Sequence, residues 1–292
     1  MIAVFSSDQY FEIIFESLNN HRIKVDFLVT ESEKPSGRGR VMTKNAAHKT
    51  AQSVGLTVET FDKLDDKSLA KLKKLIDDNK TKLGFVFSYG KIIPEEFINL
   101  FELGIINVHF SILPKYRGAA PLQGALLNAD KKTGLTFFLI DKDLDTGKLL
   151  QQIEFDIYDD DDFESIKDRA LTITAENLPA LITGYINGDI KPYEQNSGGV
   201  SYVGEIKKSD GLITSEDSAQ TALNKIRAFS VWPKAYFILE GKRVIVHKAT
   251  IDNERLEITL IQVEGKGPVS FDDFKRGYPR LLTLLPDFVN IG

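Results

Sequence analysis

The first 110 residues alternate between short apolar runs and longer stretches whose apolar residues recur at helical spacing. The apolar runs, which suit buried strands, occupy residues 1–7, 23–31, 56–61, 82–90 and 104–110. The helix-compatible stretches occupy residues 8–20, 46–55, 68–79 and 94–101. Strands that alternate with helices form parallel sheets joined by crossovers. The pattern therefore predicts a doubly wound, Rossmann-like α/β domain whose ligands bind at the carboxyl ends of the strands.

The next part of the chain continues this domain. Residues 120–130 suit a helix, residues 133–141 and 147–157 suit strands, and residues 159–188 suit a long helix. That helix begins with four acidic residues, Asp159 to Asp162, which are typical of a helix cap rather than of a metal site. The catalytic domain is therefore expected to span residues 1–188.

The last third of the chain has a different pattern. Residues 189–206 are polar and glycine-rich without periodicity, which is typical of a linker. A helix that ends before Pro233 then leads into a hairpin that turns at Glu240 and Gly241, and a further strand follows. We therefore expect a second, smaller domain at 207–292, an OB-like β-barrel.

Composition narrows the class of protein. With 42% hydrophobic and 27% charged residues, the chain is typical of soluble globular proteins. The absence of cysteine excludes disulfides, thiolate metal sites and cysteine nucleophiles. No apolar run reaches the roughly 18 residues of a membrane span, and the N-terminus has no signal-peptide pattern. We therefore expect a cytoplasmic protein that does not bind a membrane. The net charge of −5 argues against a general nucleic-acid coat, although residues 207–292 are mildly basic.

One predicted strand carries polar residues at its carboxyl end. Asn107 and His109 alternate with apolar neighbours, so their side chains point to the same face of the sheet. An amide donor beside an imidazole can bind a carbonyl oxygen while the imidazole accepts or donates a proton. Asp145, in an acidic turn, could orient that imidazole. A lone histidine is also typical of a satisfied core residue, and such a turn is often only a turn, so spacing alone leaves both interpretations open.

The segment from Asn107 to Leu150 resembles the core of the folate-dependent formyltransferases. It shares with them the Asn-x-His pair, a Ser-x-Leu-Pro loop followed by Arg-Gly, a Gly-x-Thr strand and a Leu-Asp-x-Gly turn. The resemblance implies transfer of a formyl group from 10-formyltetrahydrofolate to a primary amine, with no metal. Asn107 and His109 would bind the oxyanion, and Asp145 would pair with His109 and assist proton removal. The residues expected to line the folate site are Phe87, Tyr89, Gly90, Ser111, Ile112, Leu113 and Pro114.

Two further stretches resemble the branch of that family that formylates initiator methionyl-tRNA for translation initiation. They are the glycine-rich basic loop near residues 31–49 and the C-terminal stretches at 226–249 and 261–278. The resemblance implies that tRNA contacts a set of basic side chains, namely Arg38, Arg40, Lys44, Lys207, Lys208, Lys242 and Arg243. Such a loop, and scattered lysines, are also typical of a solvated surface. We expect a monomer.

The sequence departs from that family pattern at three places. Ser7-Asp8-Gln9 stands where Gly-Thr-Pro is usual, beside the expected acceptor pocket. Phe110 replaces a small residue, and the stretch at 251–257 is short, which predicts an abridged barrel. Two other functions therefore stay open: a sugar-nucleotide N-formyltransferase, which shares the core, and a catalytically silent RNA-binding homologue. The presence of the whole Asn–His–Asp trio argues against the second.

Overall fold

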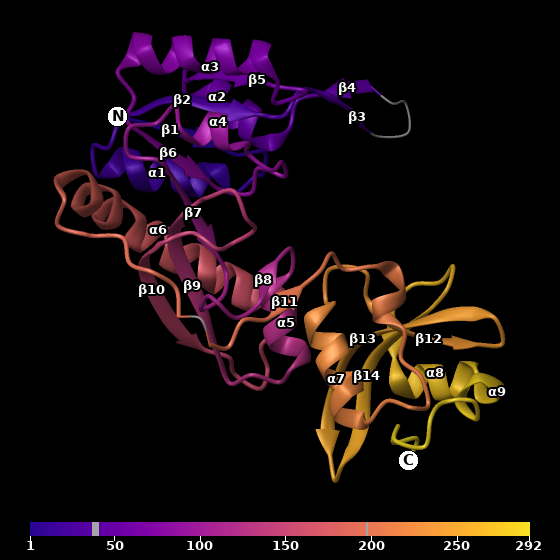
Figure 1. Cartoon of the computed structure of the whole chain (residues 1–292). Helices are drawn as coiled ribbons and strands as arrows, with labels where there is room; N and C mark the ends of the chain where they lie inside the picture. The colour runs from indigo at the N-terminus through magenta and orange to yellow at the C-terminus, as the bar shows by residue number, and fades with distance from the viewer. Residues whose placement is uncertain (37–40, 197) are drawn as a thin grey trace. The chain divides into compact units, whose positions relative to one another are not determined.

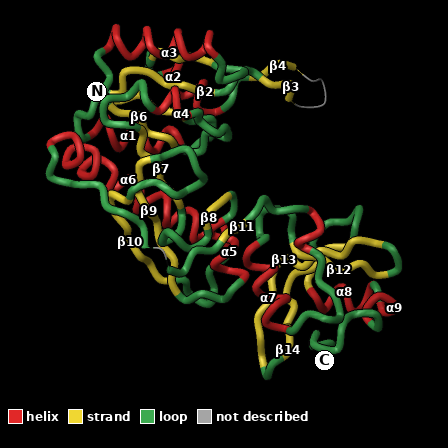
Figure 2. The backbone as a smooth tube through the Cα atoms, in the orientation of Figure 1, coloured by secondary structure: helices red, strands yellow, loops and turns green. Residues whose placement is uncertain are grey.

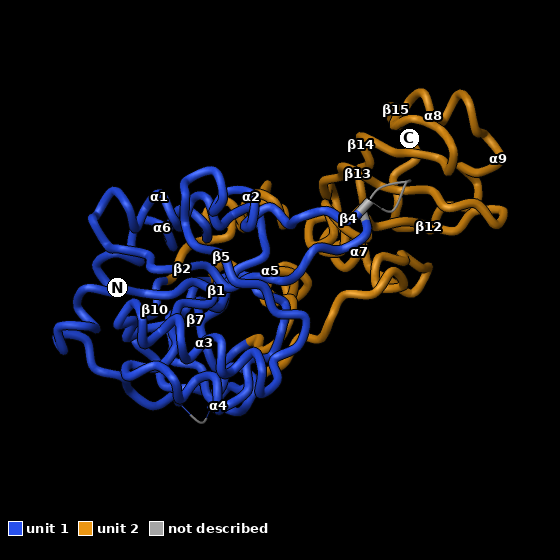
Figure 3. The backbone as a smooth tube through the Cα atoms, turned by 90° about the horizontal axis from the view of Figure 1, so that it is seen from above, with its two compact units in different colours: residues 1–115, 134–153, 170–200 blue, residues 116–133, 154–169, 201–292 orange. Residues whose placement is uncertain are grey.

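The chain forms two compact units that interleave along the sequence. The structure, a computed structural model, describes residues 1–36, 41–196 and 198–292. Unit 1 contains residues 1–115, 134–153 and 170–200, and unit 2 contains residues 116–133, 154–169 and 201–292 (Figure 3). Each unit is therefore assembled from segments that are distant in the sequence.

A seven-stranded sheet forms the framework of the N-terminal part, with the strand order β10-β9-β7-β6-β1-β2-β5. Its strands are β1 (Ile2–Phe5), β2 (Val25–Thr30), β5 (Thr57–Thr60), β6 (Leu83–Val86), β7 (Ile105–His109), β9 (Lys132–Leu139) and β10 (Leu149–Asp156). The five strands from β7 to β5 are parallel to their neighbours, which confirms the predicted doubly wound pattern. Strand β9 pairs with β7 in the antiparallel sense, so the sheet is mixed at this side.

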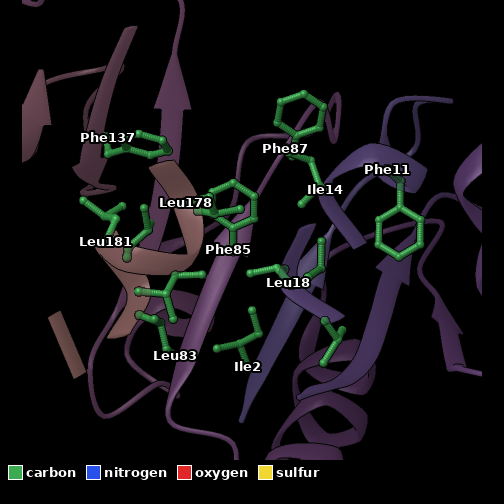
Figure 4. Close-up of a cluster of buried hydrophobic side chains, with 14 of the residues drawn as sticks. Ile2, Phe11, Ile14, Leu18, Leu83, Phe85, Phe87, Phe137, Leu178 and Leu181 are labelled. Atoms are coloured by element: carbon green, nitrogen blue, oxygen red, sulfur yellow. The ribbon is translucent and has the colours of Figure 1, made fainter. Parts of the chain in front are cut away.

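Helices cover both faces of this sheet, because the buried strands present apolar side chains to either side. Ile2 and Val4 belong to a core with α1, α2 and α6 (Figures 1 and 4). Ala3 and Phe5 belong to a second core with α3 and α4. The helices are α1 (Phe11–Asn20), α2 (Ala46–Ser53), α3 (Asp66–Asn79), α4 (Glu95–Ile98) and α6 (Phe163–Asn187). A short antiparallel pair, β3 (Lys34–Ser36) and β4 (Val41–Thr43), follows β2. In the described part of the chain, no helix has both the length and the apolar character needed to cross a membrane.

The acidic run before α6 caps that helix, as predicted. Asp162 Oδ1 accepts hydrogen bonds from the backbone nitrogens of Glu164, at 2.9 Å, and Ser165, at 3.0 Å. The neighbouring Asp161 is buried and accepts from both terminal nitrogens of Arg169 at 2.8 Å. Burial alone would raise the pKa of Asp161, but the hydrogen bonds from Arg169 and other donors hold it below the ordinary value. The run is therefore a structural feature of unit 2.

Unit 2 contains a four-stranded antiparallel sheet in the order β12-β13-β14-β15. Its strands are β12 (Ala235–Leu239), β13 (Lys242–Asp252), β14 (Arg255–Val263) and β15 (Val269–Ser270). Strands β12, β13 and β14 are labelled in Figure 2. The other elements of the unit are β8 (Arg117–Gly118), α5 (Pro121–Leu127), β11 (Tyr202–Val203), η1 (Lys208–Gly211), α7 (Ala219–Ala228), α8 (Phe271–Gly277) and α9 (Pro279–Leu282). The first hairpin turns at Glu240 and Gly241, both with positive φ, as predicted.

The segment predicted to be a linker is held at several points. Tyr193 exchanges two backbone hydrogen bonds with Leu149 at the start of β10, at 2.8 and 2.9 Å. Farther along, β11 pairs with β8 in the parallel sense. The extent of the linker, 189–206, and the domain boundaries drawn from it stay predictions.

Candidate active site

The polar pair on β7 lies at the carboxyl end of a central strand. Asn107 and His109 alternate with Ile106 and Val108, which pack into the core on the opposite face. His109 is buried, with 6% of its surface exposed, and its backbone is paired with Thr136 of β9. Strand alternation therefore places the amide and the imidazole on one face, about 7 Å apart along the strand.

Asp145 reaches this histidine from the turn between β9 and β10. Its Oδ2 lies 3.6 Å from His109 Nδ1, and both side chains are more than nine-tenths buried. The distance is long for a hydrogen bond, as is common in catalytic pairs without substrate. The carboxylate lies at Nδ1, so the other ring nitrogen, Nε2, points away from it. The pair thus has the geometry of an imidazole oriented by an acid.

The turn that carries Asp145 is tightly packed. Asp145 has φ +55°, a left-handed conformation that costs a residue with a Cβ roughly 1 kcal/mol. A Cβ on Gly147 would lie 1.7 Å from the carbonyl oxygen of Leu139, so only glycine fits there. Asp141 also holds the turn by accepting from the backbone nitrogen of Asp143, at 3.1 Å, and from the hydroxyl of Thr146, at 2.6 Å.

The loop that follows β7 is held by side chains from the neighbouring strands. The fully buried Thr136 hydroxyl donates to Ser111 O at 2.6 Å and accepts from Leu113 N at 3.1 Å. Gln152 of β10 donates to Leu113 O at 2.9 Å. Both backbone groups of Leu113 are therefore engaged, and the loop at the expected folate site has a defined shape.

The predicted folate-site residues are mostly interior. Leu113 and Ser111 are buried, and Phe87 packs against Phe110 with ring centroids 6.3 Å apart. Tyr89 is 2% exposed, and burial, together with the charge of Glu31, raises the pKa of its phenol. These buried side chains therefore lie beneath the loops of the expected folate site. Among the described residues in these loops, the apolar side chains that stay exposed include Ile92 and Leu144.

A second polar group of residues gathers where β1, β2 and β6 end. The Ser7 hydroxyl lies 3.3 Å from that of Thr30, and Asn45 Nδ2 donates to Thr30 Oγ1 at 2.8 Å. Ser88 donates to Asp8 at 3.1 Å, so the departure at Ser7-Asp8-Gln9 is part of a hydrogen-bonded network. In the described part of the chain, the buried hydroxyls of Ser6 and Tyr89 have no hydrogen-bond partner.

The predicted tRNA contacts are only partly described. Arg38 and Arg40 lie outside the described residues. Lys207, Lys208 and Lys242 are exposed, and Lys44 donates to Gln52 at 3.1 Å. Arg243 makes internal contacts instead: it donates to Pro233 O at 2.6 Å and stacks 4.1 Å from the centre of the Tyr236 ring. The contacts of all seven residues with tRNA stay predictions.

Three side chains that hold this site were not identified from the sequence as functional. Thr136 belonged to a matched motif but had no assigned role, and Gln152 and Gln195 carried no signal. Gln195 Nε2 donates to the carbonyl oxygens of Asp145, at 2.8 Å, and Gly147, at 2.9 Å. A contact between residues fifty positions apart leaves no trace in local periodicity. Across 1–36, 41–196 and 198–292, no cluster of three His, Asp or Glu side chains suits a metal ion.

Chemically, this arrangement suits attack on an activated carbonyl. An amide and an imidazole lie on one face at a strand end, and a buried carboxylate orients the imidazole. Such a site can bind a developing oxyanion and move a proton without a covalent nucleophile.

Comparison with known proteins identifies the class. A family model described as formyl transferase matches residues 1–182, and a model described as formyl transferase, C-terminal domain, matches residues 205–257. The chain therefore belongs to the formyl transferase family, which confirms the family and the fold expected from the sequence. It is similar over nearly its whole length to the methionyl-tRNA formyltransferase of Thermodesulfovibrio yellowstonii, with 34% identity over 298 residues that cover 94% of this chain and 95% of the relative.

Solved structures share the fold at lower identity. The methionyl-tRNA formyltransferase of Clostridium thermocellum has a TM-score of 0.62 at 17% identity, covering 92% of this chain and 98% of that one. An N-formyltransferase of Helicobacter canadensis, solved with folinic acid and dTDP-3-aminofucose, has a TM-score of 0.66 at 21% identity. It covers 87% of this chain and 88% of that chain. The first of these neighbours is named for methionyl-tRNA and the second was solved with an amino-sugar nucleotide, so the shared fold does not by itself name the acceptor of this chain.

Proposed function

We propose that this chain transfers the formyl group of 10-formyltetrahydrofolate to the free α-amino group of initiator methionyl-tRNA. The observation that carries the proposal is the similarity to curated methionyl-tRNA formyltransferases across both domains, such as 34% identity over 95% of the chain for the relative from Koribacter versatilis. A sugar-specific enzyme would not need the basic loop near residues 31–49 or the mildly basic C-terminal part.

The proposed reaction uses the His109 pair directly. The amine nitrogen forms a bond to the formyl carbon, and the negative charge that develops on the formyl oxygen is stabilised by Asn107 and His109. Asp145 keeps the imidazole oriented and assists removal of the proton from the attacking amine. The bond between the formyl carbon and N10 of the folate then breaks, and N10 receives the proton.

The folate co-substrate suits the loops at this edge of the sheet. A flat heteroaromatic ring needs an apolar wall and a few fixed backbone groups. The Ser111–Pro114 loop, held by Thr136 and Gln152, and the stretch from Phe87 to Gly90 offer such a floor. These loops support folate as the formyl donor.

The proposal that tRNA is the formyl acceptor depends on the basic side chains. Arg38 and Arg40 would contact the acceptor stem, and Lys207, Lys208 and Lys242 would contact phosphates farther along the tRNA. Each phosphate contact releases counterions, so tRNA use should weaken as salt rises. Arg243 makes internal contacts, so its substitution should affect stability more than the salt dependence.

The test is formyl transfer from 10-formyltetrahydrofolate to methionyl-tRNA, run beside dTDP-linked amino sugars. We expect formylmethionyl-tRNA and no formylated sugar nucleotide. Sugar product alone would establish the competing acceptor, and tRNA binding without turnover would establish the silent homologue. The Arg38→Ala variant should raise the KM for methionyl-tRNA while the KM for the folate stays unchanged.

A further inference from the structure

Part of the predicted linker runs beside the turn that carries Asp145. Leu149 N donates to Tyr193 O at 2.8 Å, and Tyr193 N donates to Leu149 O at 2.9 Å, so the two segments are antiparallel. Continued by two residues, this register brings position 195 opposite Gly147. The segment 193–195 therefore runs antiparallel to residues 147–149, at the start of β10.

At position 195 a side chain continues the backbone pairing. Gln195 Nε2 donates to Asp145 O at 2.8 Å and to Gly147 O at 2.9 Å. A carboxamide nitrogen carries two hydrogens, and here each one goes to a different carbonyl of the turn. One amide group thus bridges the residue before and the residue after Thr146.

The turn needs such a contact because its conformation is unfavourable by itself. Asp145 is left-handed, and Gly147 is pressed against the carbonyl of Leu139. Asp141 holds the turn through the backbone nitrogen of Asp143 and the hydroxyl of Thr146. Gln195 holds the carbonyls on either side of Thr146, including that of Asp145, the residue that faces His109.

We propose that Gln195 is a positioning residue for formyl transfer: it holds the Asp145–Gly147 turn so that the Asp145 carboxylate meets His109. The inference rests on the proposed function, because it assigns Gln195 a role in that reaction. Gln195 acts through Asp145, because both of its hydrogen bonds to the turn are made to backbone carbonyls. Its contribution therefore belongs to the rate of the chemical step rather than to the affinity for folate.

The decisive variant is Gln195→Glu, which keeps the shape of the side chain and replaces the donor by a carboxylate. Two carbonyl oxygens would then face an ionised acceptor, and the turn would be displaced. We expect kcat to fall roughly 10- to 100-fold, since small misplacements of catalytic groups have effects of this size. The KM for 10-formyltetrahydrofolate should stay within twofold.

The matched control is Asn196→Asp, which adds the same charge at the next residue. Asn196 is exposed and its Oδ1 accepts from Gly198 N at 2.9 Å, a role that a carboxylate retains. This variant should keep the wild-type kcat. If both variants lose activity equally, charge rather than positioning explains the loss, and the proposal is overturned.

The pH dependence separates positioning from a merely structural role. A protonated glutamic acid regains one donor, so the ratio of Gln195→Glu to wild-type activity should rise as the pH falls from about 8 to about 5. A ratio that stays constant would contradict the proposal. Gln195→Met, which removes the donors without adding charge, serves if the glutamate variant does not fold, and its kcat should also fall while the KM for folate holds.

Amide hydrogen exchange tests the contact without any turnover. In Gln195→Glu, peptides covering residues 141–147 should exchange at least several-fold faster than in the wild type, and peptides from β1 should not change. Unchanged exchange at 141–147 overturns the positioning role. An inactive wild-type protein in which the substitution still accelerates this exchange would instead overturn the proposed function, so the two failures are distinguishable.

Discussion

The two halves of the sheet's carboxyl edge are held together in different ways. Around β7 and β9, the backbone of the site is held by side chains that come from distant parts of the sequence, such as the buried Thr136 and the half-buried Gln152. Around β1, β2 and β6, the network joins short polar side chains that range from the buried Thr30 to the exposed Ser88. There, among the described residues, the buried hydroxyls of Ser6 and Tyr89 lack hydrogen-bond partners.

This difference corresponds to two tasks. A group that stabilises charge in a transition state has to be in place before the reaction, which requires supporting side chains with few alternative positions. A surface that recognises part of a substrate needs polar side chains that a ligand can reach, and Ser88 in this half is exposed. The β7–β9 half thus suits chemistry, and the β1–β2–β6 half suits recognition.

The largest effect is expected at the pair itself. The Asp145→Asn and His109→Ala variants should lower kcat by roughly 10² to 10⁴, the usual contribution of a positioned acid or base. The measurement is the rate of formyl transfer, with circular dichroism to show that each variant folds. Asp143→Asn, an exposed acid of the same turn, is the control and should keep the wild-type rate. Normal turnover in Asp145→Asn would contradict the assignment of the chemical step to the β7–β9 half of the sheet edge.

A smaller effect is expected from Thr136→Val, which keeps the shape but removes the hydroxyl. Ser111 O would lose its donor and Leu113 N its acceptor, and each unpaired buried group costs about 1–3 kcal/mol. The free energy of unfolding, measured in urea, should fall by about 2–3 kcal/mol, and kcat should fall as well. Thr183→Val, which loses a helix bond to Pro179 O, should cost at most about 1 kcal/mol. Equal losses in the two variants would contradict the special role of Thr136.

The smallest effect is expected at Tyr89, in the other half. Because its buried hydroxyl has no partner among the described residues, Tyr89→Phe should leave stability unchanged or raise it by up to about 1 kcal/mol. The control is Tyr185→Phe, whose hydroxyl donates to Leu103 O at 3.0 Å and whose loss should cost about 1 kcal/mol. If Tyr89→Phe is the more damaging change, the second half is as completely paired as the first. A raised substrate KM with unchanged stability would support recognition.

Much of the framework is readable from the sequence, for definite physical reasons. Strands buried on both faces, such as β1 and β6, are nearly continuous apolar runs in the sequence. The tight turn at Glu240 and Gly241 is recognisable because it contains a glycine, which suits the positive φ of the turn. Asn107 and His109 were identifiable because alternation places them on one face and a family pattern surrounds them. These signals are local, so periodicity and spacing reveal them.

The rest depends on contacts that local patterns do not record. Gln195 lies in a polar stretch that has the composition of a linker, yet it contacts a turn fifty residues earlier. Arg243 belongs to a set of basic residues with an expected surface role, but its guanidinium lies over Tyr236. The antiparallel pairing of β9 with β7 likewise follows from how the chain returns to the sheet. Only the three-dimensional arrangement distinguishes these residues from their neighbours.

The contact between Gln195 and the Asp145 turn also has a consequence for synthesis on the ribosome. Fifty residues separate the two positions, and the turn leaves the ribosome first. At 5–20 residues per second, Gln195 is added roughly 3–10 s after Asp145. During that interval β9 and the turn exist without their last support. The acidic turn should therefore be the final part of the N-terminal sheet to mature in a nascent chain.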